Sequence, residues 1–139
     1  MSTVSGMPQV DLVEETFIAA APALVEARIR QPAFTARLWP DLRLQVQADR
    51  GVEGLRWTAS GALVGSTEIW LQAYRDGVLV HTYLRCDPTR PNAPTEAVQV
   101  SPRAAVRELQ RRAKYAKRVL WELKDSVEAG RRPGESAVR

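Results

Sequence analysis

Hydrophobic and polar residues alternate with a period of two along the middle of the chain. Leu42, Leu44, Val46 and Ala48 alternate with charged or amide side chains, which predicts a strand over 42–49 with one solvent-facing side. The same period predicts strands over 55–60, 67–74 and 78–86. The turn signals Arg50-Gly51 and Asp76-Gly77 join neighbouring strands. Four successive strands with short turns form an antiparallel meander.

The segment before this meander combines one further strand with two short helices. The run VDLVEETFI, residues 10–18, is rich in β-branched and aromatic residues and predicts a strand. Pro22 suits the first turn of a helix, and Pro32 ends that helix because the residue before a proline avoids the helical region. A second short helix is expected over 33–38, before Trp39-Pro40.

The last part of the chain predicts a long amphipathic helix. Ser101 and Pro102 are typical of an N-cap and a first helical residue, and Gly130 is typical of a helix end. Between them, apolar residues recur every three or four positions: Val106, Leu109, Ala113, Ala116, Leu120, Leu123 and Val127. Residues 87–101 contain three prolines and few large apolar residues, so they are expected to form a linker.

These elements predict an α+β fold, in which a curved antiparallel sheet wraps around the C-terminal helix. The sheet needs a cover for its apolar face, and the final helix carries the long apolar stripe. The expected domain spans residues 10–130, with flexible tails at 1–9 and 131–139. Ala113 and Ala116 are small residues in the middle of the stripe. They favour either close packing on the sheet or a ligand cavity, and the sequence leaves both open.

The order of these elements resembles that of the START-like or SRPBCC helix-grip superfamily, which includes Bet v 1-like proteins and bacterial polyketide cyclases and dehydrases. The resemblance covers residues 9–134. It is carried by the run GLRWTASGALVGSTEIWLQAYRDGVLVHTYLRCDP and the ending LKDSVEAGRRPGE, which are similar to an actinobacterial polyketide cyclase-like subgroup. The resemblance implies an apolar cavity between the sheet and the last helix that binds a lipid or polyketide. Most members have six or seven strands, whereas the pattern here predicts five.

Composition narrows the class of protein further. A chain of 139 residues with 45% hydrophobic and 26% charged residues is typical of one globular domain. The longest apolar stretch, residues 17–24, is far shorter than the roughly 20 residues needed to span a bilayer, so no transmembrane segment is expected. The first basic residue is Arg28, which does not fit a secretory signal, and a cytoplasmic location is expected.

The contents of cysteine and histidine limit the chemistry. Cys86 is the single cysteine and His81 the single histidine, so neither an intramolecular disulfide nor a Cys/His zinc site is expected. No nucleotide-binding loop, serine-centred elbow or paired-carboxylate motif occurs. The prediction is therefore a protein that uses no metal and no organic cofactor.

The candidate ligand-binding residues are those of the apolar alternating set and of the helix stripe. The same residues could also be plain core, since packing alone needs similar side chains. They are Trp57, Ile69, Leu71, Thr82, Leu84, Cys86, Ala113, Ala116 and Leu120.

Three polar residues on the last predicted strand are the candidates for catalysis. His81, Tyr83 and Arg85 share one strand face and could act as general base and acid in a cyclisation or dehydration. Alternation puts them opposite the apolar set, on the solvent side, unless a bulge reverses the register. The alternative is an outer aromatic patch, and a homodimer through Trp70 and Tyr83 is expected. A catalyst and a non-catalytic lipid carrier or sensor both stay open.

Basic residues are concentrated in the C-terminal helix. Residues 103–118 contain seven basic residues and one acidic residue, Glu108. Such a run could contact nucleic acid or an anionic membrane surface. It could equally be the solvated outer face of a helix whose other side is buried. The second interpretation is favoured, because the sequence has no RNA-binding motif with stacking aromatics.

Overall fold

A computed structural model describes residues 6–139 and shows six antiparallel strands, two short helices and one long helix. Residues 1–5 of the expected N-terminal tail lie outside the described residues. The elements are β1 (Val10–Ile18), α1 (Pro22–Ile29), α2 (Pro32–Leu38), β2 (Leu42–Asp49), the 3-10 turn η1 (Gly51–Glu53), β3 (Gly54–Gly61), β4 (Leu63–Tyr74), β5 (Gly77–Arg90), β6 (Ala93–Ala97) and α3 (Pro102–Val127). The main sheet has the strand order β1-β5-β4-β3-β2, and β6 pairs with the end of β5. The predicted α+β helix-grip architecture is confirmed.

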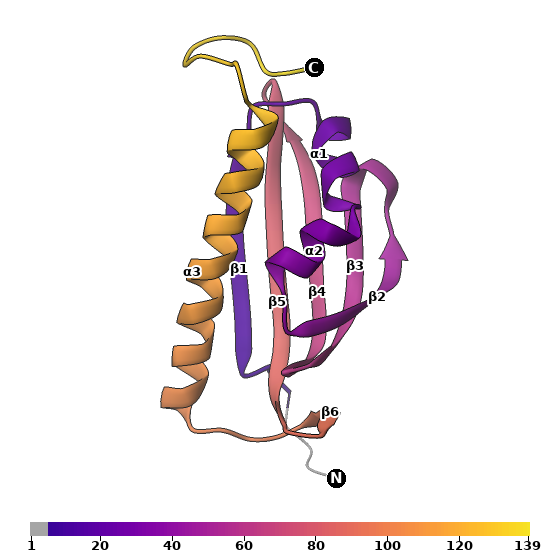
Figure 1. The fold of residues 1–139 in the computed structure, drawn as a ribbon, viewed down its shortest axis with the longest axis vertical. Coiled ribbons are helices and arrows are strands. Elements are labelled where there is room, and N and C mark those ends of the chain that lie inside the picture. The colour runs from indigo at the N-terminus through magenta and orange to yellow at the C-terminus, as the bar shows by residue number, and fades with distance from the viewer. Residues whose placement is uncertain (1–5) are drawn as a thin grey trace.

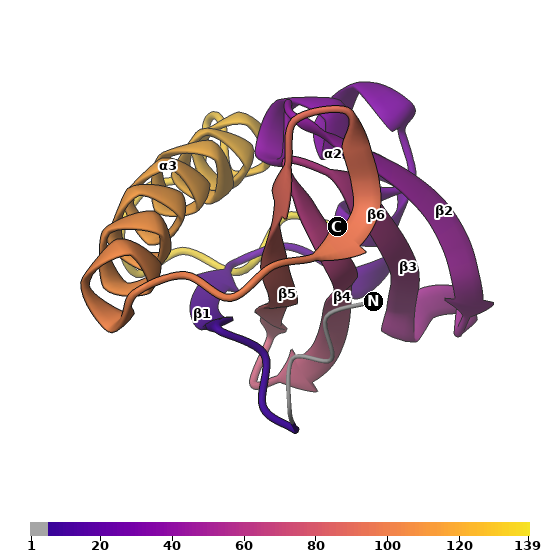
Figure 2. The ribbon, with the colours of Figure 1, turned by 90° about the horizontal axis from the view of Figure 1, so that it is seen from below.

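The helices lie together on the concave face of the sheet. In Figures 1 and 2, α3 runs along the β1 side of this face, while α1 and α2 cover the part next to it. Contacts of α3 are mainly with β1 and then with α2. The long helix therefore covers one side of the sheet rather than its middle, and the two short helices complete the cover.

Strand alternation sorts the side chains as the sequence predicts. On β5, Val80, Thr82 and Leu84 are fully buried on the concave face. Most of their strand partners on the same face are likewise buried, including Leu12 of β1 and Ile69 of β4. Glu14, the β1 partner of Thr82, is half-buried. Burial of these apolar side chains, at roughly 25 cal/mol per Å² of apolar surface, is the main force that holds the helices to the sheet.

The expected linker over residues 87–101 is wrong for residues 87–97. β5 continues to Arg90, and a two-residue turn leads into the sixth strand, β6. The turn is formed by Pro91 and by Asn92, whose φ of 66° is tolerated by asparagine. Most of β6 is exposed, so its sequence lacks the apolar alternation that marks the other strands.

The C-terminal segment is attached to the domain at its end, in contrast to the expected flexible tail. The amide of Val138 donates to the carbonyl oxygen of Ala19 at 2.9 Å, and the amide of Ala21 donates to the carbonyl oxygen of Val138 at 2.7 Å. Ala137 is buried, and its amide donates to Asp76 Oδ2 at 3.1 Å. A single backbone bridge of this kind leaves no periodic pattern in the sequence.

Candidate functional site

An apolar hollow lies on the concave side of the sheet, between the short helices and strands β2 and β3. None of the described residues of α3 lines it, so it is not the cavity between the sheet and the last helix that the resemblance implies. The volume of the hollow is about 270 Å³. The apolar part of its wall consists of Ile29, Pro32, Leu44, Val46, Leu55 and Trp57. We refer to it below as the concave hollow.

The fold places Trp57 in this hollow through strand alternation and register. Leu55 and Trp57 of β3 point to the concave side, and both are almost fully buried. Val46 of β2 is the direct partner of Trp57 in the sheet, so it lies next to the indole. Val46 is 56% exposed, which puts it at the mouth of the hollow. The hollow thus has an apolar floor and an accessible apolar rim.

An ion pair closes one side of the rim. Arg30 donates from Nη1 and Nη2 to the two carboxylate oxygens of Asp49, at 2.9 and 2.6 Å. This hydrogen bonding from Arg30, together with the amide of Gly51, lowers the pKa of Asp49 to about 2. Asp49 is therefore an anion at neutral pH and has no proton to donate to a bound molecule.

A second hollow of about 340 Å³ lies on the other side of α2, between the short helices and α3. Its apolar wall is formed by Phe34 of α2 and by Val119 and Leu123 of α3. An ion pair between Arg37 and Glu122 connects α2 to α3 at this hollow. Helix α2 consequently contributes to the walls of both hollows.

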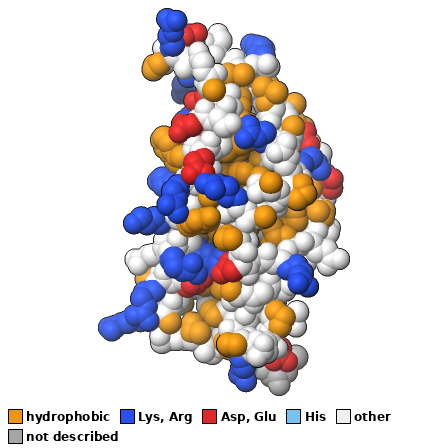
Figure 3. Space-filling view, viewed as in Figure 1, with side chains coloured by type: hydrophobic (Ala, Val, Ile, Leu, Met, Phe, Trp, Pro, Cys, Tyr) orange, Lys and Arg blue, Asp and Glu red, His pale blue; other side chains and the backbone are white. Residues whose placement is uncertain are grey.

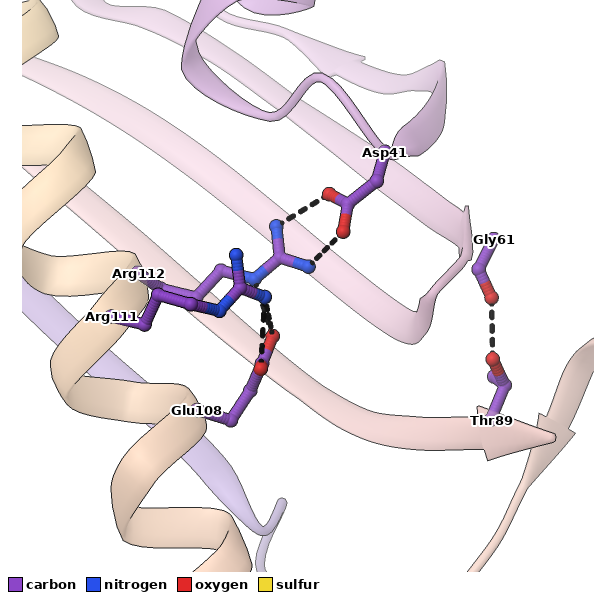
Figure 4. Close-up of polar contacts among 6 residues, drawn as sticks. All are labelled: Asp41, Gly61, Thr89, Glu108, Arg111 and Arg112. Carbon is purple, nitrogen blue, oxygen red and sulfur yellow. Dashed lines mark hydrogen bonds and ion pairs between the residues drawn. The ribbon is translucent and has the colours of Figure 1, made fainter. Parts of the chain in front are cut away.

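Arg112 connects α3 to the loop that follows α2, as Figure 4 shows. It donates from Nη1 and Nη2 to Asp41 at 2.7 and 2.6 Å, and from Nε to Glu108 at 2.7 Å. Its side chain is only 4% exposed. Burial alone would lower the pKa of Arg112, but the bonds to Asp41 and Glu108 outweigh burial and raise it. We call Arg112, Asp41 and Glu108 the Arg112 latch.

The sequence analysis assigned Arg112 to the outward basic run, and the structure corrects this. A signal was available, because Arg112 lies three residues after Leu109 and four residues before Ala116, within the apolar stripe. Its bidentate partner, Asp41, is 71 residues away in the chain. No local pattern indicates that pairing.

The candidate ligand-binding residues all lie on the concave side, but only one of them lines the concave hollow. Trp57 does so. The fully or almost fully buried core beside it contains Ile69, Leu71, Thr82, Leu84, Cys86, Ala116 and Leu120, with Ala113 packed against it. A ligand contact by these residues stays a prediction. Burial raises the pKa of Cys86 to about 12, so its thiol is neutral and does not provide a nucleophile near neutral pH.

His81, Tyr83 and Arg85 lie on the outer face of the sheet. The residues that alternate with them along β5 face the helices. The His81 ring stacks on Trp70 with a centroid distance of 4.4 Å. Its Nδ1 is 2.9 Å from Glu15 Oε2, and its Nε2 is 2.9 Å from Gln72 Oε1. The sheet separates this group from the concave hollow. The expected homodimer through this face stays a prediction.

The basic side chains of α3 gather along one edge of the molecule, as Figure 3 shows. Arg103, Arg107, Lys114, Lys117 and Arg118 of α3 are exposed. Arg118 lies over the ring of Tyr115, with its Cζ 5.1 Å from the ring centroid. None of the described helices is long and apolar enough to cross a membrane.

Neither known protein families nor curated proteins give a match to the sequence. Solved structures do share its fold. DR_A0006 from Deinococcus radiodurans has a TM-score of 0.61 and 12% identity, covering 86% of this chain and 98% of that one. The Aha1 dimer from Colwellia psychrerythraea has a TM-score of 0.57 and 13% identity, covering 88% and 99%. TTHA0849 from Thermus thermophilus has a TM-score of 0.53 and 14% identity, covering 88% and 99%. The chain has the START-like helix-grip fold that the sequence predicts.

Proposed function

We propose that the protein binds a hydrophobic or aromatic small molecule, of the lipid or polyketide class, in the concave hollow. The observation that carries this proposal is the accessible apolar pocket built on Trp57 under α1 and α2. A tryptophan wall offers a large apolar surface and one N–H donor that can orient a ligand. The helix-grip fold supports the proposal by analogy alone, because fold does not imply function.

The size of the hollow restricts the ligand. Pockets for small molecules usually measure roughly 300 to 1,000 Å³, and the concave hollow, at about 270 Å³, is close to the lower end. One aromatic ring system, or one end of a longer chain, fits such a volume. The rest of a longer ligand would leave over Val46, which is exposed.

The chemistry of the lining favours a carrier or sensor over a cyclase or dehydratase. Proton transfer in a cyclisation needs an acid or a base within hydrogen-bond reach of the substrate. The ionisable groups that line the hollow are Arg30 and Asp49, which are paired with each other. His81 and Tyr83, the candidates for catalysis, lie across the sheet. We therefore propose binding without chemical conversion.

The test uses N-phenyl-1-naphthylamine, a neutral probe whose fluorescence rises in apolar surroundings. We expect saturable binding to the full chain and a shift of the Trp57 indole N–H resonance in a ¹H–¹⁵N spectrum. Val46→Gln should weaken binding about fivefold, because it removes roughly 1 kcal/mol of apolar contact at the rim. Val13→Gln is the matched control, since Val13 is 58% exposed on the outer face of β1.

The outcome distinguishes a specific pocket from general apolar adsorption. Equal weakening by both valine variants, or binding that leaves the Trp57 resonance unchanged, would contradict the proposal. Thermal unfolding of both variants checks that the fold is intact. The alternative function, a cyclase or dehydratase, is tested by mass spectrometry of reaction mixtures that contain a linear polyketide. Conversion of the polyketide would show that the protein is an enzyme.

A further inference from the structure

The outer face of the sheet carries a second, chemically different groove. It measures about 340 Å³, and six of its lining residues are Arg50, Arg56, Glu68, Trp70, Tyr83 and Arg85. We call it the outer groove. Its wall is rich in hydrogen-bond donors, whereas the wall of the concave hollow is mostly apolar. The two sites lie on opposite faces of the same sheet.

Two of the three arginines in the outer groove have acidic partners. Arg50 forms an ion pair with Glu68. Arg85 Nε lies 3.5 Å from Asp11 Oδ1, which is a long contact for an exposed pair. These two cations are thus at least partly neutralised within the protein.

Arg56 is the cation in the outer groove that has no acidic partner among the described residues. It is half-buried on β3. Glu68 is its direct neighbour in the sheet, but the carboxylate of Glu68 is engaged by Arg50. A partly desolvated guanidinium without a counterion attracts an anion from solution, and its planar fork suits two oxygens of one carboxylate or phosphate.

The rest of the groove offers aromatic side chains that can contact the uncharged part of such an anion. Tyr83 of β5 is the sheet neighbour of Glu68 on the side away from Arg56, so Arg56 and Tyr83 lie two strand spacings apart, roughly 10 Å. One molecule with a single aromatic ring can span this distance. Trp70 provides an aromatic surface, and its ring is held in place by stacking on His81.

We infer that the outer groove binds a small aromatic acid, with its oxyanion on Arg56 and its ring against Trp70 and Tyr83. This inference is independent of the proposed function, because the concave hollow lies across the sheet and takes an uncharged apolar group. The expected homodimer through Trp70 and Tyr83 would occupy the same face and is the competing prediction; a two-fold contact there would bring arginines of both copies together, which favours the small acid.

The test measures binding of benzoate by isothermal titration and by shifts of the Trp70 indole N–H resonance. We expect saturable binding to the full chain that Arg56→Gln weakens about tenfold, the effect of losing roughly 1.4 kcal/mol. Arg43→Gln is the matched control, because Arg43 is an exposed arginine on the same face of β2, outside the groove. It removes the same charge and should leave binding unchanged.

Two further probes separate the parts of the inference. Benzyl alcohol carries the ring without the charge, and inorganic phosphate carries the charge without the ring; both should bind at least tenfold more weakly than benzoate. Equal binding of either probe, equal loss in both arginine variants, or no saturable binding of benzoate would overturn the inference. Arg56→Lys keeps the charge without the planar fork and should give an affinity between those of the unmodified chain and Arg56→Gln. If Arg56→Gln does not fold, Arg56→Lys tests the inference in its place.

Discussion

Two threonines on the concave face show how the environment of one hydroxyl sets its contribution to stability. Thr67 and Thr82 lie on neighbouring strands, and both are buried. Thr67 Oγ1 donates to the carbonyl oxygen of Tyr83 at 2.7 Å. Thr82 Oγ1 has no hydrogen-bond partner among the described residues. A buried hydroxyl without a partner costs free energy that a methyl group would not.

Replacement of each threonine by valine should therefore have opposite effects. Thr82→Val is expected to raise the free energy of unfolding by about 1 kcal/mol, because it removes an unsatisfied polar atom at nearly constant shape. Thr67→Val is expected to lower it by about 1 kcal/mol, because it leaves a backbone carbonyl with one bond fewer. Urea denaturation of both variants measures the difference. A destabilised Thr82→Val would mean that a bound water or ligand satisfies its hydroxyl.

At the scale of the elements, α3 is held in place by polar contacts as well as by its apolar stripe. The Arg112 latch fixes its first half to the loop before β2. Near its end, Lys124 donates from Nζ to the carbonyl oxygen of Phe17, and the carboxylate of Glu128 accepts from the amide of Ala19. These bonds connect the helix to segments about 70 to 110 residues away in the chain.

Substitutions of the two partners in the Arg112 latch, Asp41 and Arg112, should have unequal effects on stability. Asp41→Asn should lower the free energy of unfolding by about 2 kcal/mol, because it leaves a buried guanidinium with one acidic partner. Arg112→Met should change it by less than about 1 kcal/mol, because it removes the buried charge as well as the bond. Chemical denaturation checks both values.

A matched control for the latch is Glu122→Gln. It breaks the exposed Arg37–Glu122 pair between α2 and α3, and should cost less than about 0.5 kcal/mol. If Asp41→Asn has an effect as small as this control, the Arg112 latch does not contribute to the attachment of α3.

At the scale of the whole molecule, three carboxylates with lowered pKa values link stability to pH: Asp49, which pairs with Arg30, and Glu108 and Glu128 of the C-terminal helix region. Burial alone would raise the pKa values of Glu108 and Glu128, but hydrogen bonds from Arg112 to Glu108 and from Lys124 to Glu128 lower both overall. A carboxylate with a pKa lower in the folded than in the unfolded chain stabilises the fold above its unfolded pKa. This contribution is lost as the pH falls through the folded pKa.

We therefore expect the melting temperature to fall as the pH decreases from about 5 to 3. Glu128→Gln should make this dependence shallower, since the variant lacks one of the carboxylates responsible. Glu53→Gln changes an exposed carboxyl with no ion pair among the described residues and should leave the slope unchanged. Thermal unfolding at a series of pH values measures the slopes; identical slopes for Glu128→Gln and the unmodified chain would refute the assignment to Glu128.

The sequence predicted most elements because their patterns are local. The strand over residues 10–18 and the helix from Pro102 agree with β1 and α3. β6 was missed because its side chains are mostly exposed and carry no apolar period. Of the residues that line the concave hollow, Trp57 was identified by alternation. Leu44 and Val46 of β2, and the lining residues from α1 and α2, were not among the predicted site residues. They come together through the packing of helices on strands, which has no signature in neighbouring residues.

The sequence by itself indicated which side of strands β2 to β5 faces the helices, since a period of two gives a strand one apolar face. It also determined that the final helix is amphipathic, since its period of about 3.6 leaves one apolar stripe. Only the tertiary structure decided where that helix lies across the sheet, that Arg112 reaches Asp41, and that Arg56 has no acidic partner among residues 6–139. These are relations between residues far apart in the chain. They depend on how whole elements pack, and a local pattern does not encode that.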